Sequence, residues 1–231
     1  MPAKGAAPRS PPLRGRQAEA AVHDIAIMDA AFTTLTSNPR ATMAEIAELA
    51  GVGVASLYRR YPTRQELAHQ LCLRAMDSIS AAADACRLQL KDPATEPWPE
   101  FLGFITAAIA AGAGAMRALA GTFDAGPDLS RAAAQMNKAI QQVVRLAQRR
   151  GAVREDVTAA DITQFFEMLR AIRAGTPQRS DELRQRYLLL FSGALRTVPV
   201  RHELTVAAPR WQEVSATWNK PAATAPGAWP T

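Results

Sequence analysis

The chain has 231 residues, 48% of them hydrophobic and 6% aromatic, and its abundant alanine favours helices, so we expect an all-α fold with a small and a larger domain. The net charge of +6 suits a polyanionic partner, although a merely basic soluble protein would carry it as well. No stretch reaches the about 18 apolar residues of a membrane span, and the N-terminus has no apolar signal segment, so we expect a cytoplasmic protein without a membrane partner.

The first segment in chain order, residues 1–16, is basic and rich in proline. It carries four prolines and no acidic residue, together with Lys4, Arg9, Arg14 and Arg16. We expect this arm to be disordered in the free protein. It could lie along DNA phosphates or reach into a minor groove, and a solvated tail without a partner fits the sequence equally well.

Residues 17–66 are predicted to form a small helical domain. Ile25, Met28, Ala31 and Phe32 recur at helical spacing and indicate its first helix. The segment 42–67 then has the pattern of two short helices joined by a tight turn, with a third helix directly after them. This arrangement is typical of a helix-turn-helix, whose second helix enters the DNA major groove.

The local signals within this motif agree with one another. Thr42 and Glu45 have the spacing of a capping box, and Gly51 stands where the first of the two helices must end. Leu57 is expected to anchor the second helix, and Pro62 prevents it from continuing. Its outward face is predicted to hold Val54, Ala55, Ser56, Tyr58, Arg59 and Arg60.

Residues 44–67 read AEIAELAGVGVASLYRRYPTRQEL and resemble the signature of TetR-type transcriptional regulators. In register with that signature are Thr42, Ile46, Ala47, Ala50, Gly51, Val52, Leu57, Tyr58, Pro62, Thr63 and Leu67. The chain departs from it at Gly53, where serine usually caps the recognition helix, and at Arg60, Tyr61 and Arg64. The resemblance implies a sequence-specific DNA-binding regulator, expected to act as a repressor. Its DNA contacts would come from Thr42, Gly53, Val54, Ala55, Ser56, Tyr58, Arg59, Arg60 and Arg64.

Residues 67–200 are predicted to form a larger helical bundle. Apolar periodicity and Gly/Pro breaks place its helices at about residues 64–90, 100–111, 115–122, 128–150, 158–174 and 180–197. Residues 201–231 carry tryptophans and prolines without a periodic pattern, so we expect a poorly ordered tail.

Two segments of this bundle are also similar to TetR-type ligand-binding domains. Residues 149–161, RRGAVREDVTAAD, resemble the loop before the penultimate helix, and residues 187–196 resemble the last helix. The resemblance implies a homodimer formed by the last two helices. Their apolar surface exceeds the need of one bundle face, although burial within one chain is the alternative. The expected dimer contacts are Ile162, Phe165, Phe166, Leu169, Leu188, Phe191 and Leu195.

The resemblance further implies a small-molecule effector that binds the larger domain and releases a palindromic operator. Glycines and alanines between residues 103 and 121 leave room among the helices. Met and aromatic side chains at helical spacing more often belong to a plain core. The candidate lining residues are Phe101, Phe104, Ile105, Met116, Arg117, Phe123, Met136, Asn137 and Ile140.

Enzyme signatures are missing from the sequence. The three histidines are scattered, and neither H-E-x-x-H nor C-x-x-C occurs, so we expect no enzyme, no cofactor and no metal. Cys72 and Cys86 fall on one predicted helix, too far apart to bond, which indicates reduced thiols. The alternative function is a helical ligand- or protein-binding module without specific DNA binding.

Overall fold

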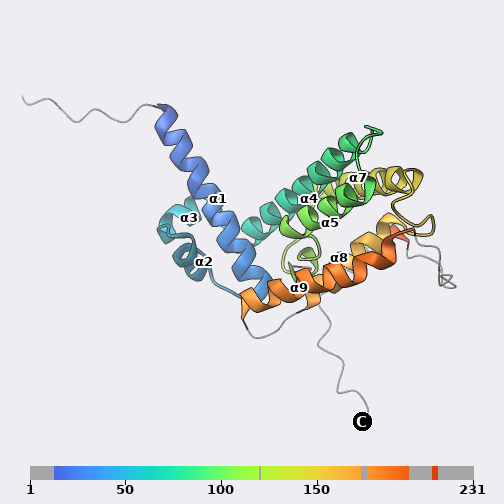
Figure 1. The fold of residues 1–231 in the computed structure, drawn as a ribbon. Helices are drawn as coiled ribbons and strands as arrows, with labels where there is room; N and C mark the ends of the chain where they lie inside the picture. Colours follow the sequence, from blue (N-terminus) through green and yellow to red (C-terminus); the bar gives the residue numbers. More distant parts are fainter. Residues whose placement is uncertain (1–12, 120, 173–175, 198–209, 213–231) are drawn as a thin grey trace, which may run out of the picture. The chain divides into compact units, whose positions relative to one another are not determined.

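The computed structural model describes residues 13–119, 121–172, 176–197 and 210–212. The regular secondary structure of these residues is helical (Figure 1). The predicted all-α class is confirmed. The chain divides into two compact units, residues 1–64 and 65–231. This division falls two residues before the expected domain boundary.

The first unit contains α1 (Leu13–Ser37), α2 (Met43–Ala50) and α3 (Val54–Arg60). Helix α1 begins at Leu13, inside the segment expected to be disordered, whereas residues 1–12 lie outside the described residues. All three helices contribute buried side chains to a small core, among them Ile27, Leu35, Ile46 and Leu57. This core fixes the faces that α2 and α3 turn outward.

A left-handed glycine makes the tight turn between α2 and α3. Gly51 has φ 67°, a conformation that costs glycine little, and it follows the last residue of α2. The Val52 N–H then donates to the Ala47 carbonyl at 3.0 Å, which closes the helix end. The predicted end of this helix is therefore confirmed.

The second unit is a helical bundle that begins within α4 (Arg64–Gln89). The remaining elements are α5 (Pro97–Ala110), α6 (Met116–Leu119), α7 (Pro127–Arg149), α8 (Ala159–Ala171), α9 (Pro177–Ser192) and the short 3₁₀ turn Gly193–Leu195. Helices α8 and α9 lie side by side in Figure 1. The core is built from fully buried side chains on several of these helices, including Ile79, Phe101, Met136, Ile140, Ile162 and Leu169.

Three helices start earlier than their periodicity predicts, each at a proline. Helices α5, α7 and α9 begin at Pro97, Pro127 and Pro177, because a first-turn residue needs no N–H for the helix ladder. Thr176 precedes the last of these prolines and accepts from the Arg179 N–H at 3.1 Å. The sequence pattern predicts a break between helices at each of these prolines, whereas in the structure each proline begins a helix.

Buried and half-buried side chains hold the loops of the bundle. The Arg150 guanidinium donates to the carbonyls of Leu90, Asp92, Pro93 and Thr95 at 2.6–3.1 Å, which fixes the loop before α5. The Leu90 carbonyl directly follows α4 and the other three belong to the loop, so one side chain satisfies the helix end and the loop together.

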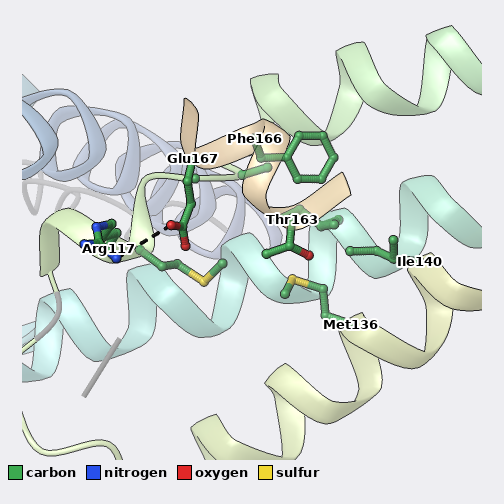
Figure 2. A pocket seen from close by; sticks show the side chains of 10 residues that line it. Arg117, Met136, Ile140, Thr163, Phe166 and Glu167 are labelled. Carbon is green, nitrogen blue, oxygen red and sulfur yellow. Dashed lines mark ion pairs between the residues drawn. The ribbon is translucent and has the colours of Figure 1, made fainter. Parts of the chain in front are cut away.

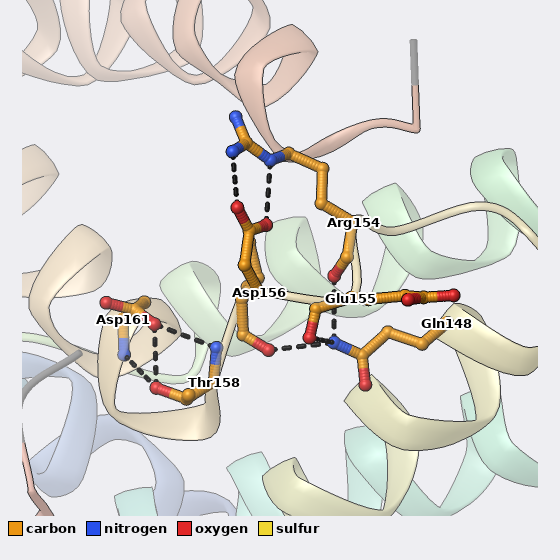
Figure 3. Close-up of polar contacts among 7 residues, drawn as sticks. Gln148, Arg154, Glu155, Asp156, Thr158 and Asp161 are labelled. Atoms are coloured by element: carbon orange, nitrogen blue, oxygen red, sulfur yellow. Dashed lines mark hydrogen bonds and ion pairs between the residues drawn. The ribbon is translucent and has the colours of Figure 1, made fainter. Parts of the chain in front are cut away.

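A second polar cluster fixes the loop before α8 (Figure 3). The Gln148 amide nitrogen lies 2.8 Å from the carbonyl oxygens of Arg154 and Val157. Thr158 and Asp161 form a capping box at the start of α8. Thr158 and Asp161 belong to the sequence pattern of residues 149–161 noted above, so part of that pattern supplies hydrogen bonds of the loop itself.

The remaining expectations concern the cysteines and the tail. Cys72 and Cys86 are buried and unpaired, and burial raises the pKa of each thiol to about 12. Of the predicted tail, residues 201–209 and 213–231 lie outside the described residues. Among the helices that the structure describes, none is both long enough and apolar enough to cross a bilayer.

Candidate nucleic-acid interface

Helix α3 is anchored from one side. Of its seven residues, only Leu57 is buried. Val54 is 42% exposed and Tyr58 is 48% exposed, and Ala55, Ser56 and Arg59 are also exposed. The outward face predicted for this helix is therefore exposed, and a major groove admits an α-helix.

The start of α3 lacks a side-chain cap. Gly53 occupies the capping position with φ −67°, and no hydrogen bond from a side chain closes this end of the helix. A Cβ at this position would meet only the Ser56 Oγ, at 4.0 Å. The space would therefore accommodate the serine that usually stands at this position.

Asp24 on α1 holds the end of α3. Its Oδ1 lies 2.8 Å from the Arg60 Nε and accepts a hydrogen bond of 2.6 Å from the Tyr61 hydroxyl. Burial raises the pKa of Tyr61 to about 12, and the bond to Asp24 adds to this shift. Sequence reasoning placed Arg60 near DNA and missed Asp24. The only signal was the departure from the family pattern at Arg60 and Tyr61.

Two other predicted DNA contacts are engaged inside the first unit. The Arg64 guanidinium donates to the Pro39 carbonyl. The Thr42 hydroxyl accepts from the Glu45 N–H at 3.3 Å and donates to the Glu45 carboxylate at 2.7 Å. The bond from the Thr42 N–H holds the pKa of Glu45 below its usual value. Thr42 and Arg64 therefore fix the two ends of the motif, and their contacts with DNA stay a prediction.

A shallow hollow opens beside α3. Its volume is about 450 Å³, and the Arg59 guanidinium at its wall donates to the Ser56 Oγ at 3.2 Å. None of its eight lining residues is acidic, so the hollow suits a phosphate group. It is lined by His23, Ile27, Gly51, Val52, Gly53, Ser56, Arg59 and Arg60.

The larger unit holds a small, partly open cavity (Figure 2). Its volume is about 10 Å³, room for roughly one water molecule. Arg117 pairs with Glu167 at 3.7 Å beside it. Four predicted effector residues line it, Met116, Arg117, Met136 and Ile140, together with Ile79, Ala113, Gly114, Thr163, Phe166 and Glu167.

The other predicted effector residues do not line this cavity. Phe101, Phe104 and Ile105 are at most 2% exposed and belong to the core. Phe123 lies with its ring edge-on to His69 at 5.7 Å between ring centres, and Asn137 lies outside the lining. The structure thus favours the plain-core alternative for the aromatic stripe of α5, because helical spacing alone does not distinguish core from cavity.

Most of the predicted dimer contacts are already buried within one chain. These are Ile162, Phe165, Phe166, Leu169 and Leu188, each at most 9% exposed. Of the other two, Phe191 is 42% exposed and Leu195 is partly exposed. The large exposed apolar side chains on α8 and α9 are Met168, Leu189, Leu190 and Phe191. Five of the seven predicted dimer contacts therefore lie on faces that turn inward within the chain, and the dimer interface itself stays a prediction.

Comparisons with known proteins cover both units. Residues 27–71 match the family model described as bacterial regulatory proteins of the tetR family. Residues 92–197 match the model of the C-terminal domain of SbtR-like transcriptional regulators. The chain is 36% identical over 72 residues to the HTH-type transcriptional repressor LfrR of Mycolicibacterium smegmatis, a match that spans 31% of this chain and 35% of LfrR.

One solved structure supports the same helical architecture. A TetR transcription regulatory protein from Mycobacterium vanbaalenii is 25% identical, with a TM-score of 0.50, over 78% of this chain and 99% of its own. A TetR transcriptional regulator from Streptomyces coelicolor is 24% identical, with a TM-score of 0.45, over 76% of this chain and 99% of its own.

Proposed function

Because the chain belongs to the TetR family of transcriptional regulators, we propose that it is a repressor that binds a two-fold symmetric operator as a homodimer and leaves it when a small molecule binds the larger unit. The repressor LfrR, which is 36% identical to this chain over 72 residues, supports repression over activation. Each part of the proposal is supported by a different region of the molecule.

The exposed face of α3 is the observation that carries DNA binding. Leu57 is the buried anchor of the helix and Arg60 pairs with Asp24, so the remaining side chains of α3 are available to base edges and phosphates. Ser56 and Arg59 bring hydrogen-bonding groups, whereas Val54 and Ala55 suit the methyl group of thymine. Tyr58 presents a hydroxyl of the kind that positions a phosphate.

Exposed apolar side chains at the C-terminal end of α9 support the homodimer. The earlier turns of this helix expose polar residues such as Arg179, Glu182 and Gln185. In its last turn Leu189, Leu190 and Phe191 are exposed, where a helix of a soluble monomer normally has polar residues. A second copy related by a two-fold axis would cover these apolar side chains and would pair two α3 helices for inverted half-sites.

The small cavity supports an effector that acts by opening the larger unit. At about 10 Å³ it is too small for an organic molecule, so a ligand that uses this cavity stabilises a wider arrangement of the same helices. Met116 and Met136 line it, and methionine side chains adapt readily to new shapes. The ligand shifts DNA affinity only as far as it binds one arrangement better than the other.

Selection of DNA from a random pool tests the function as a whole. The full chain is incubated with random duplexes at about 0.15 M salt, and bound DNA is recovered and sequenced over successive rounds. The proposal expects enrichment of an inverted repeat whose half-sites lie a helical turn or a multiple of it apart. Retention of all sequences alike would instead support a helical binding module without specific DNA recognition.

A further inference from the structure

Asp24 differs in its surroundings from the other groups near the proposed DNA face. One carboxylate oxygen, Oδ1, contacts both the Arg60 Nε and the Tyr61 hydroxyl. Tyr61 is 7% exposed, so its hydroxyl depends on this acceptor and keeps the carboxylate in place. Arg60, in contrast, is 41% exposed and lines the hollow beside α3.

Arg60 is therefore shared between two possible anions. Its guanidinium lies at the wall of a hollow that suits a DNA phosphate. The guanidinium is already paired with the Asp24 carboxylate of the same chain. A basic side chain that reaches a phosphate strengthens binding to every DNA sequence alike. A side chain held away from phosphates adds nothing to that non-specific affinity.

We propose that Asp24 is a specificity-determining positioning residue. From α1 it holds the Arg60 side chain of α3 and withholds that side chain from DNA phosphates. This inference rests on the proposed function and concerns how the same DNA-binding surface discriminates. Asp24 also places a negative charge, 29% exposed, beside the hollow, and this charge opposes a phosphate that enters without base contacts. The other side chains of α3 then determine the ratio of specific to non-specific affinity.

The salt dependence of non-specific binding measures the number of phosphate contacts. The affinity of the full chain for a mixed-sequence duplex is measured by fluorescence anisotropy across a series of potassium chloride concentrations. Each phosphate contact adds about 0.9 to the slope of log affinity against log salt. Asp24→Asn keeps an oxygen that accepts from Tyr61 and removes the charge that holds Arg60.

The expected result is a steeper slope, by about 0.9 for each bound α3 helix, in Asp24→Asn. Asp29→Asn is the matched control, because it removes the same charge from an exposed position on the same helix. Arg60→Gln in the otherwise unchanged chain should leave the slope as it is. Asp24→Asn combined with Arg60→Gln should return the slope to that of the unchanged chain.

Two results would overturn the proposal. One is an equal slope for Asp24→Asn and Asp29→Asn, and the other is a slope that flattens in Arg60→Gln alone, since Arg60 would then already contact a phosphate. The second result does not depend on the folding of Asp24→Asn. A full chain that binds no duplex of any sequence would contradict the proposed function itself, and this inference with it.

Discussion

At the scale of single residues, Arg59 is the arginine of α3 that is better placed to contact a base edge. Its contact with Ser56 is within α3 itself, so it does not tie the side chain to another helix. Arginine recognises guanine through two parallel hydrogen bonds. The sequence predicts this role for Arg59 and Arg60 alike. In the structure the two differ, because Arg60 pairs with Asp24 on α1.

Arg59→Ala should weaken binding to the selected operator by about 1–3 kcal/mol and relax the choice of base at one position of each half-site. Arg145→Ala removes the same charge from an exposed position on α7 and serves as the control. Anisotropy titrations with the operator and with single-base variants measure both effects. An equal loss in the two variants would show that Arg59 contributes only its charge.

Tyr61 makes the stability of the first unit depend on pH in the alkaline range. Its folded pKa is raised to about 12 from 10.0, so its contribution to stability is fully present below pH 10.0 and is lost as the pH rises toward 12. Tyr61→Phe should lose about 1.5 kcal/mol of stability at neutral pH, because it removes a hydrogen bond to a carboxylate. It should also show a smaller decline between pH 9 and 11 than the unchanged chain. Urea unfolding at each pH checks this, and parallel declines in both proteins would contradict it.

At the scale of elements, local signals in the sequence predicted the helices well. The capping box at Thr42 and the helix end at Gly51 are confirmed, because each depends on residues within one helical turn. The Asp24 contact to Tyr61 joins residues 37 positions apart. Spacing in one sequence does not reveal such a pair, since it forms only once α1 and α3 pack.

The faces of α8 and α9 were harder to predict for a related reason. Nearly every turn of these helices carries apolar residues, so periodicity permits several inward faces. Burial of Leu188 turns Leu189 and Leu190 outward, a consequence of packing that the sequence alone did not specify. The cavity lining is similar, because only packing distinguishes core from free volume.

The turn between α5 and α6 lies directly on α8. A Cβ on Gly114 would approach the Phe166 carbonyl oxygen to 2.4 Å, and Gly114 has φ +78°. Gly114→Ala should therefore cost about 2–4 kcal/mol, from backbone strain and from the displaced turn. Gly103→Ala on α5, where a Cβ meets nothing within 4 Å, should be neutral or stabilising by up to about 1 kcal/mol. Urea unfolding compares the two, and equal stabilities would exclude this packing.

At the scale of the whole molecule, the proposal requires two copies. Leu190 is 61% exposed on α9 and Leu88 is 64% exposed on α4, so the two leucines differ in location rather than in exposure. Leu190→Glu should convert the dimer to monomers, because a charge in an apolar interface lacks a partner. Leu88→Glu should leave the dimer intact. Analytical ultracentrifugation measures both, and a chain that is monomeric without substitution would refute the homodimer.

The whole account depends on α3 being the surface that contacts the operator. A cysteine introduced by Ser56→Cys would be the reactive thiol of the described part of the chain, because Cys72 and Cys86 are buried with pKa values raised to about 12. Ala107→Cys, at an exposed position on α5, provides the control.

The decisive measurement is the rate at which each of these variants reacts with a thiol reagent, with and without the selected operator. We predict that the operator slows the reaction at position 56 and leaves the reaction at position 107 unchanged. An operator that binds the protein but leaves the rate at position 56 unaltered would contradict the central claim.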